Sequence, residues 1–130
     1  MYKKYLKTIE VAQRLIDLKF YTQSVHCSYY AVRQLMQYKL ANTDNRPMSY
    51  ELQEVEFKEC KSSHEALLME IKNRISNPKE AKKFCEAFRN LRSCRVDADY
   101  TKRLFSDEDS CECKSQADSL ISKLNNYFKQ

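Results

Sequence analysis

The sequence lacks the residues that make tight turns: its 130 residues include no glycine and only two prolines. A sheet protein needs turns with positive φ or a fixed φ, and glycine and proline supply most of them. Much of the remaining chain consists of residues with high helix propensity, chiefly Leu, Lys, Glu, Ala, Gln, Arg and Met. The composition therefore predicts an all-α protein and excludes a fold built on β-sheets.

Long hydrophobic runs are also missing. No apolar run approaches the roughly 18 residues that a transmembrane helix requires, and the first residues, MYKKYLKTIE, are amphipathic, unlike a signal peptide. We therefore expect a cytoplasmic protein with no membrane contact. The length fits one helical domain over residues 1–130.

Six cysteines are scattered irregularly along the chain. A helical protein without an export signal is expected to keep them reduced, and Cys27 and Cys85 fall on apolar faces, as small core residues do. Cys111 and Cys113 form a C-x-C pair, but residues two apart on a helix point to different faces, which disfavours a zinc site. We expect no metal and no cofactor.

Apolar residues recur at intervals of three and four along most of the chain, which predicts amphipathic helices. Capping signals support their starts: Ser62 precedes Glu65 by three residues, Asn77 precedes Pro78, and Ser106 precedes three acidic residues. The expected helices cover residues 2–19, 22–41, 62–75, 78–95 and 107–128. Short connections favour antiparallel packing, so we expect an antiparallel four- to five-helix up-down bundle.

Two segments are harder to assign. Residues 51–61 are acidic with isolated apolar positions, and they fit either a short helix laid over the bundle or a mobile connection. Residues 96–105 break the apolar pattern, so we expect the preceding helix to end near Arg95.

The net charge is +5 and is distributed unevenly. Residues 61–95 carry nine Lys and Arg against four Asp and Glu, whereas segments 42–60 and 96–110 each carry two against five. A basic excess of this kind suits an anionic partner such as RNA phosphate or a nucleotide. The alternative is an ordinary solvated basic face.

The segment RNLRSCRVDADY, residues 89–100, contains the best candidate site. The apolar stripe of its helix leads to Arg95, which places a guanidinium on the core-facing side. An arginine there needs a carboxylate, a helix-end carbonyl or a ligand, and Asp97 and Asp99 lie within local reach. Arg95 is then either part of a phosphate site with Arg89 and Arg92 or a buried residue with a structural role only.

The two histidines do not form an obvious catalytic pair. His26 precedes Cys27, and adjacent helical residues do not face each other, so a Cys–His nucleophile is not expected. His64 falls in the first turn of a helix, which favours capping or local hydrogen bonding. Tyr29 and Tyr30 are interpreted as structural.

Four segments, in order, resemble the HEPN domain family. SVHCSYYAVRQLMQYKLA at 24–41 is similar to its Tyr-Tyr-Ala helix, and SSHEALLMEI at 62–71 to its Ser/Thr-His-x-x-Leu segment. RSCRVDADY at 92–100 resembles its Arg-x-x-Ala-Asp-Tyr element, and the last helix, with an acidic start and Ala117, resembles its closing helix. The resemblance covers nearly the whole chain.

The resemblance implies a helical bundle that dimerises and is often encoded beside a minimal nucleotidyltransferase as a toxin–antitoxin pair. Many members are metal-independent ribonucleases with an Arg followed four to six residues later by His. Here both histidines precede Arg95, and Tyr100 stands in the place of that His. Tyrosine is a poor general base at neutral pH. The resemblance also implies a second role for Tyr100, in which a partner nucleotidyltransferase modifies its hydroxyl.

Three functions follow from these observations. The favoured one is a binding module for a nucleotide, RNA or a nucleotidyltransferase partner, in which Arg89, Arg92, Arg95, Asp97 and Asp99 form the site. The alternatives are a ribonuclease toxin, with Arg95 stabilising phosphate and Tyr100 replacing histidine, and a structural or regulatory dimer subunit. We expect ribonuclease activity to be weak or absent. Apolar residues such as Phe88 exceed what a small bundle is expected to cover, which predicts a homodimer.

Overall fold

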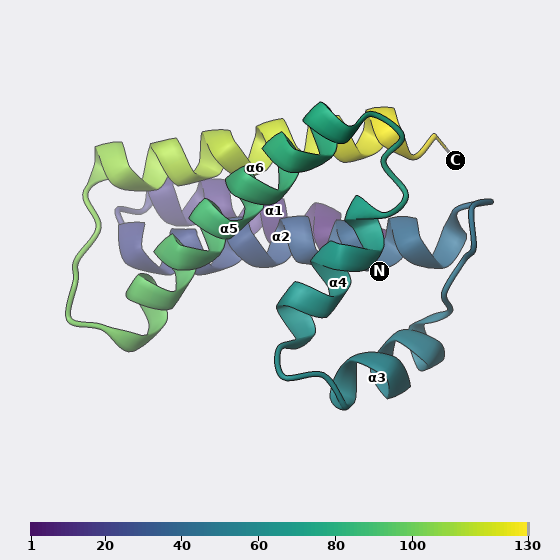
Figure 1. The fold of residues 1–130 in the computed structure, drawn as a ribbon. Helices are drawn as coiled ribbons and strands as arrows, with labels where there is room; N and C mark the ends of the chain where they lie inside the picture. Colours follow the sequence, from purple (N-terminus) through teal and green to yellow (C-terminus); the bar gives the residue numbers. More distant parts are fainter. Residues whose placement is uncertain (130) are drawn as a thin grey trace.

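A computed structural model describes residues 1–129, which form six α-helices and no β-strand, and it confirms the all-α prediction. Figure 1 shows their arrangement in space. In chain order the helices are α1 (Tyr2–Asp17), α2 (Tyr21–Asn42), α3 (Tyr50–Lys58), α4 (Ser63–Lys72), α5 (Pro78–Tyr100) and α6 (Asp107–Tyr127).

Helix α2 is the centre of the fold, because it contacts each of the other five helices of the described chain. Figure 1 shows α1 and α6 running alongside α2, with α5 crossing obliquely over them and α3 and α4 to one side. The α2 side chains Tyr29, Leu35 and Met36 are fully buried. The side chains of α2 are therefore positioned by contacts with helices from the whole chain.

The starts of the last three helices are capped as the sequence predicts. The Ser62 hydroxyl accepts a hydrogen bond from the Glu65 backbone, and the Asn77 side chain accepts two from the first turn of α5. Ser106 and Asp109 form a complete capping box at the start of α6. Each cap satisfies backbone N–H groups that have no partner within the helix.

The structure corrects the predicted end of α5 and shows that the segment before α4 contains a short helix. Helix α5 does not end near Arg95 but continues to Tyr100, where the Thr101 backbone N–H bonds the Asp97 carbonyl. Asp97 and Asp99 therefore lie on α5 and not in the connection that follows it. The undecided segment 51–61 is helical as far as Lys58, as part of α3, whose start is capped by the Ser49 hydroxyl.

The turn between α1 and α2 shows how the chain manages without glycine. Lys19 has a φ of 67°, in the left-handed region where helix C-caps favour glycine. The Lys19 N–H bonds the Ile16 carbonyl at 2.9 Å, and the Phe20 N–H bonds the Leu15 carbonyl at 2.7 Å. These two bonds are those of a Schellman motif, so a lysine with a Cβ occupies a position that suits glycine.

The core is continuous and includes the stripe on α5 that leads to Arg95. Ala81, Phe84, Phe88 and Leu91 are buried, as predicted. Phe88 is thus covered by the bundle itself and offers no surface to a second copy, so this part of the argument for a dimer was wrong. No helix within residues 1–129 has both the length and the apolar character required to cross a bilayer.

Candidate functional site

Arg95 lies on the inner side of α5 with its guanidinium among aromatic rings. Its side chain is only 5% exposed. The guanidinium carbon lies 5.0 Å from the ring centroid of Tyr29, 5.5 Å from that of Tyr30 and 5.9 Å from that of Tyr100. Tyrosine rings attract a cation over their faces. The aromatic contacts therefore hold the charge of Arg95 in a fixed place near the end of α5.

Asp99 is the carboxylate nearest to Arg95. One of its oxygens, Oδ2, lies 3.5 Å from Nη1 of Arg95 and 2.8 Å from Nδ1 of His26. Asp99 is four residues after Arg95 on α5, whereas His26 comes from α2, so the carboxylate connects the two helices. The carboxylate faces both partners, and its oxygen lies 3.5 Å from Nη1 of Arg95, longer than a usual hydrogen bond.

Two further arginines approach the same place. Arg33 of α2 and Arg92 of α5 lie, like Arg95, close enough to His64 and Tyr29 to affect the pKa values of both. We call Tyr29, Arg33, His64, Arg92 and Arg95 the Arg95 cluster. Within residues 1–129, neither Arg33 nor Arg92 has a carboxylate within 4 Å.

The three guanidinium groups of the cluster retain unused hydrogen-bonding capacity. The Nε atoms of Arg33, Arg92 and Arg95 are buried and have no partner among the described residues. Arg33 makes one bond, from Nη2 to the Ser63 hydroxyl at 3.3 Å. Buried donors without partners are costly, and arginine pairs well with planar or tetrahedral oxyanions. The cluster is therefore short of negative charge and of acceptors.

His64 reaches the cluster from the first turn of α4 and is neutral there. Burial, followed by the charges of Arg33, Arg92 and Arg95, lowers the pKa of His64 to about 4. Burial raises the pKa of Tyr29 to about 12, so its hydroxyl stays protonated, and it shares a hydrogen bond with Nδ1 of His64. Nε2 is therefore the ring nitrogen that remains for a ligand.

The structure separates two of the predicted site residues from the others. Arg89 forms an ion pair with Glu65 of α4, and Asp97 pairs with Arg103 at 3.2 Å. The hydrogen bond from Arg89 lowers the pKa of Glu65. Arg89 and Arg92 nevertheless line one shallow hollow of about 350 Å³ at the surface. Arg89 thus stands at the rim, with its charge already compensated.

Tyr100 is the last residue of α5 and is 75% exposed. Its ring lies near the Arg95 guanidinium, while most of the residue is exposed to solvent. The structure therefore places Asp99 and the ring of Tyr100 beside the buried Arg95, and Arg92 near the same His64 imidazole as Arg95. It adds three residues that sequence reasoning had not placed in a site, namely Tyr29, Arg33 and His64.

A weak signal for these three residues was present in the sequence. Tyr29 and Arg33 are four apart on one helix and therefore share a face. His64 lies two residues after the N-cap Ser62, so its position in the first turn of a helix was predictable. Its hydrogen-bond partner, however, was sought only within that helix. The contact between His64 and Tyr29 joins residues 35 apart in the chain.

The chemistry available here is the binding of an oxyanion. Three guanidinium groups are donors, Nε2 of the neutral imidazole adds a polar contact, and the Tyr30 and Tyr100 rings lie beside Arg95. Within residues 1–129, no group of three or more His, Cys, Asp or Glu side chains is arranged to hold a metal ion. The residues of the cluster therefore suit phosphate or carboxylate ligands.

Comparison of the chain with models of known protein families, with curated proteins and with solved structures finds no match.

Proposed function

We propose that this chain is a HEPN-like binding module that holds the phosphate groups of RNA in the Arg95 cluster. One observation carries the proposal: three guanidinium groups from α2 and α5 surround Tyr29 and His64, each with a buried, unpartnered Nε, and Asp99 is the one carboxylate within 4 Å of them in residues 1–129. A phosphate supplies the missing charge and acceptors.

RNA is favoured over a free nucleotide because the region is open. The hollow that Arg92 lines is shallow, and Tyr100, whose ring centroid lies 5.9 Å from the Arg95 guanidinium carbon, is 75% exposed. Unpaired bases stack on exposed aromatic rings, while arginines contact the backbone between them. The basic excess of residues 61–95, which includes most of α5, adds a nonspecific attraction for a polyanion.

The experiment is a binding assay with fluorescently labelled single-stranded RNA in the presence of a metal chelator, followed by electrophoresis of the recovered strand. We expect binding that weakens with added salt and an RNA strand that remains intact. Arg95→Ala is expected to weaken binding by about 1–3 kcal/mol. Unchanged RNA affinity in a folded Arg95→Ala protein would show that Arg95 has a structural role only.

A second candidate function, a ribonuclease, is favoured by the position of His64. Although this histidine precedes Arg95 in the sequence, its imidazole lies with Arg95 in the cluster. Arg95 would stabilise the phosphate, and His64 or Tyr100 would transfer a proton. Nδ1 of His64 is hydrogen-bonded to the Tyr29 hydroxyl, so the proton would be transferred through Nε2. Cleavage lost in both Arg95→Ala and His64→Gln, with no metal present, would establish this function.

The resemblance also supports a partner protein, a minimal nucleotidyltransferase encoded beside this chain as a toxin–antitoxin pair. The exposed hydroxyl of Tyr100 offers such an enzyme an accessible group next to the Arg95 cluster. Inspection of the neighbouring open reading frame tests this partner directly. A nucleotidyltransferase there supports the pair, and a lone gene argues against it.

A further inference from the structure

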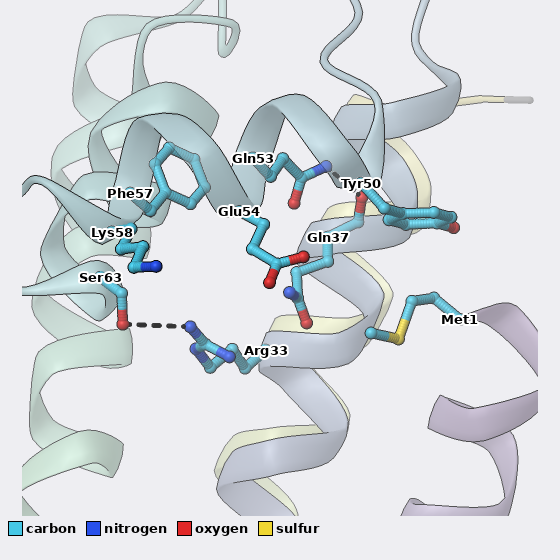
Figure 2. A pocket seen from close by; sticks show the side chains of 9 residues that line it. All are labelled: Met1, Arg33, Gln37, Tyr50, Gln53, Glu54, Phe57, Lys58 and Ser63. Atoms are coloured by element: carbon cyan, nitrogen blue, oxygen red, sulfur yellow. Dashed lines mark hydrogen bonds between the residues drawn. The ribbon is translucent and has the colours of Figure 1, made fainter.

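A second pocket lies between α2, α3 and α4, and Figure 2 shows the side chains that line it. Its volume is about 440 Å³, within the range of roughly 300–1,000 Å³ that is typical of small-molecule sites. Most of its lining comes from α2 and α3, and Arg33 is the one residue that it shares with the Arg95 cluster. Its residues fall into three groups of different chemistry.

The first group is cationic. The guanidinium of Arg33 points into the pocket beside the Ser63 hydroxyl, and the ammonium of Lys58 lies at the same end (Figure 2). No carboxylate in residues 1–129 forms an ion pair with either cation. This end of the pocket suits a carboxylate or a phosphate.

The second group consists of acceptors. Gln53 is only 2% exposed, and its Nε2 donates to the carbonyl oxygens of Gln37 and Met48 at 3.0 and 2.9 Å. Its Oε1 is buried and has no partner among the described residues. Figure 2 shows the carboxylate of Glu54 next to this amide. A buried acceptor without a donor is costly, so this part of the pocket suits a cationic or neutral donor.

Glu54 and Lys58 are one helical turn apart on α3, the spacing at which such side chains usually pair. Here they form no ion pair within 4 Å. The third group is apolar: Tyr50 and Phe57 contribute rings to the pocket wall. Positive charge, negative charge and apolar surface are thus presented separately within one cavity.

We propose that this pocket binds a free α-amino acid with a large apolar side chain. Its carboxylate lies between Arg33 and Lys58, its ammonium group donates to Glu54 and to Oε1 of Gln53, and its side chain packs against Tyr50. A simple anion would leave Oε1 of Gln53 unsatisfied and would lie near the charge of Glu54. A polyphosphate would place still more negative charge beside Glu54.

The test is calorimetric titration of the protein with L-phenylalanine, L-leucine and L-methionine. Two analogues of phenylalanine serve as matched probes: 3-phenylpropionate lacks the ammonium group, and 2-phenylethylamine lacks the carboxylate. We expect at least one amino acid to bind. If phenylalanine binds, each analogue should bind about ten-fold more weakly or worse, because each lacks one charged hydrogen-bonding group.

Two variants link the binding to this pocket. Glu54→Gln and Lys58→Gln change exposed side chains on α3, so both proteins should fold, and each is expected to weaken amino-acid binding by about ten-fold. Neither residue belongs to the Arg95 cluster, so both variants should bind RNA as the wild type does. Failure of the amino acids to bind at millimolar concentration, or equal binding of 3-phenylpropionate and phenylalanine, would overturn the proposal and leave the RNA result unaffected.

Discussion

A hydrogen bond between the Tyr29 hydroxyl and Nδ1 of His64 joins the central helix α2 to the first turn of α4. The same tyrosine ring lies against the guanidinium of Arg95. Tyr29 therefore connects the three helices that contribute to the Arg95 cluster. The contact fixes the position of the imidazole, whereas its neutral state comes from burial and from the charges of the neighbouring arginines.

The neutral state of His64 makes stability depend on pH. The pKa of His64 is lowered to about 4, mainly by burial, while an unfolded chain has a histidine pKa near ~6.5. Between these values the unfolded state binds more protons, so stability is lost as the pH falls from about 6.5 towards 4. Because His64 is only half-buried, screening reduces the expected loss to about 1–2 kcal/mol.

Urea unfolding at pH 7.5 and pH 5.0 measures this loss. His64→Gln should remove it, whereas His26→Gln, which changes the other histidine of the chain, should retain it. An equal loss in the wild type and in His64→Gln would mean that His64 is not buried as a neutral imidazole.

Asp99→Asn should move stability and RNA affinity in opposite directions. The substitution removes the carboxylate that faces the buried Arg95, which should cost about 1–3 kcal/mol of unfolding free energy. It also leaves the cluster more positive, so RNA affinity at low salt should rise about three-fold. Thermal unfolding and RNA titration measure the two effects.

The matched control is Asp97→Asn on the same helix. Asp97 pairs with Arg103 at the surface, so its loss should change stability by less than about 1 kcal/mol. If Asp99→Asn weakens RNA binding in a folded protein, Asp99 positions Arg95 for the ligand and its charge does not oppose binding.

Lys19→Gly should stabilise the protein. Lys19 holds a left-handed backbone in which its Cβ is strained, and glycine relieves that strain but is more flexible in the unfolded chain. The expected net gain is about 0.5–1 kcal/mol, measured by urea or thermal unfolding. Lys19→Ala keeps the Cβ and should give no gain. An equal gain from alanine would show that the lysine side chain, and not its backbone, is responsible.

The helix starts were predictable because their signals are local. The Ser62, Asn77 and Ser106 caps are each satisfied within three residues, and the buried stripe of α5 followed from its periodicity. The end of α5 was predicted wrongly because residues 96–105, which include Asp97 and Asp99, break the apolar pattern. In the fold their carboxylates find partners in Arg103 and His26, and these contacts permit the helix to continue.

The candidate site was less predictable than the helix starts, because part of it depends on contacts between helices and not on local signals. Arg92, Arg95 and Asp99 are close in sequence and were identified together. Arg33 and His64 approach them from α2 and α4 through packing that a periodicity argument does not reveal. The resemblance to HEPN domains pointed to the segments that carry Tyr29 and His64 but not to their contact with each other.

The prediction of a homodimer remains open, and the structure suggests another surface for it. Leu18, Phe20 and Leu104 are exposed, Leu104 to 85%. Figure 1 shows that the turn before α2 and the loop before α6 lie at the same end of the molecule, where the Phe105 N–H bonds the Thr22 hydroxyl at 3.0 Å. Apolar side chains that gather at one end suit an interface between two copies.

Sedimentation at micromolar concentration should therefore give twice the chain mass of 15.5 kDa for the wild type. Leu104→Asp should give a monomer, and Val55→Asp, which changes an exposed valine on α3, should remain a dimer. A wild-type monomer would contradict the prediction.

The central claim is that RNA phosphate is held by the Arg95 cluster and not merely attracted by a basic surface. Two variants with equal loss of charge on α5 separate these possibilities. Arg92 belongs to the cluster, whereas Lys83 is exposed and lies nine residues earlier, about half a revolution around the helix. Fluorescence anisotropy with labelled single-stranded RNA at several salt concentrations should show Arg92→Gln about ten-fold weaker, with the salt slope reduced by about one, and Lys83→Gln nearly unchanged. Equal weakening by the two variants, or no RNA binding by the wild type, would contradict the claim.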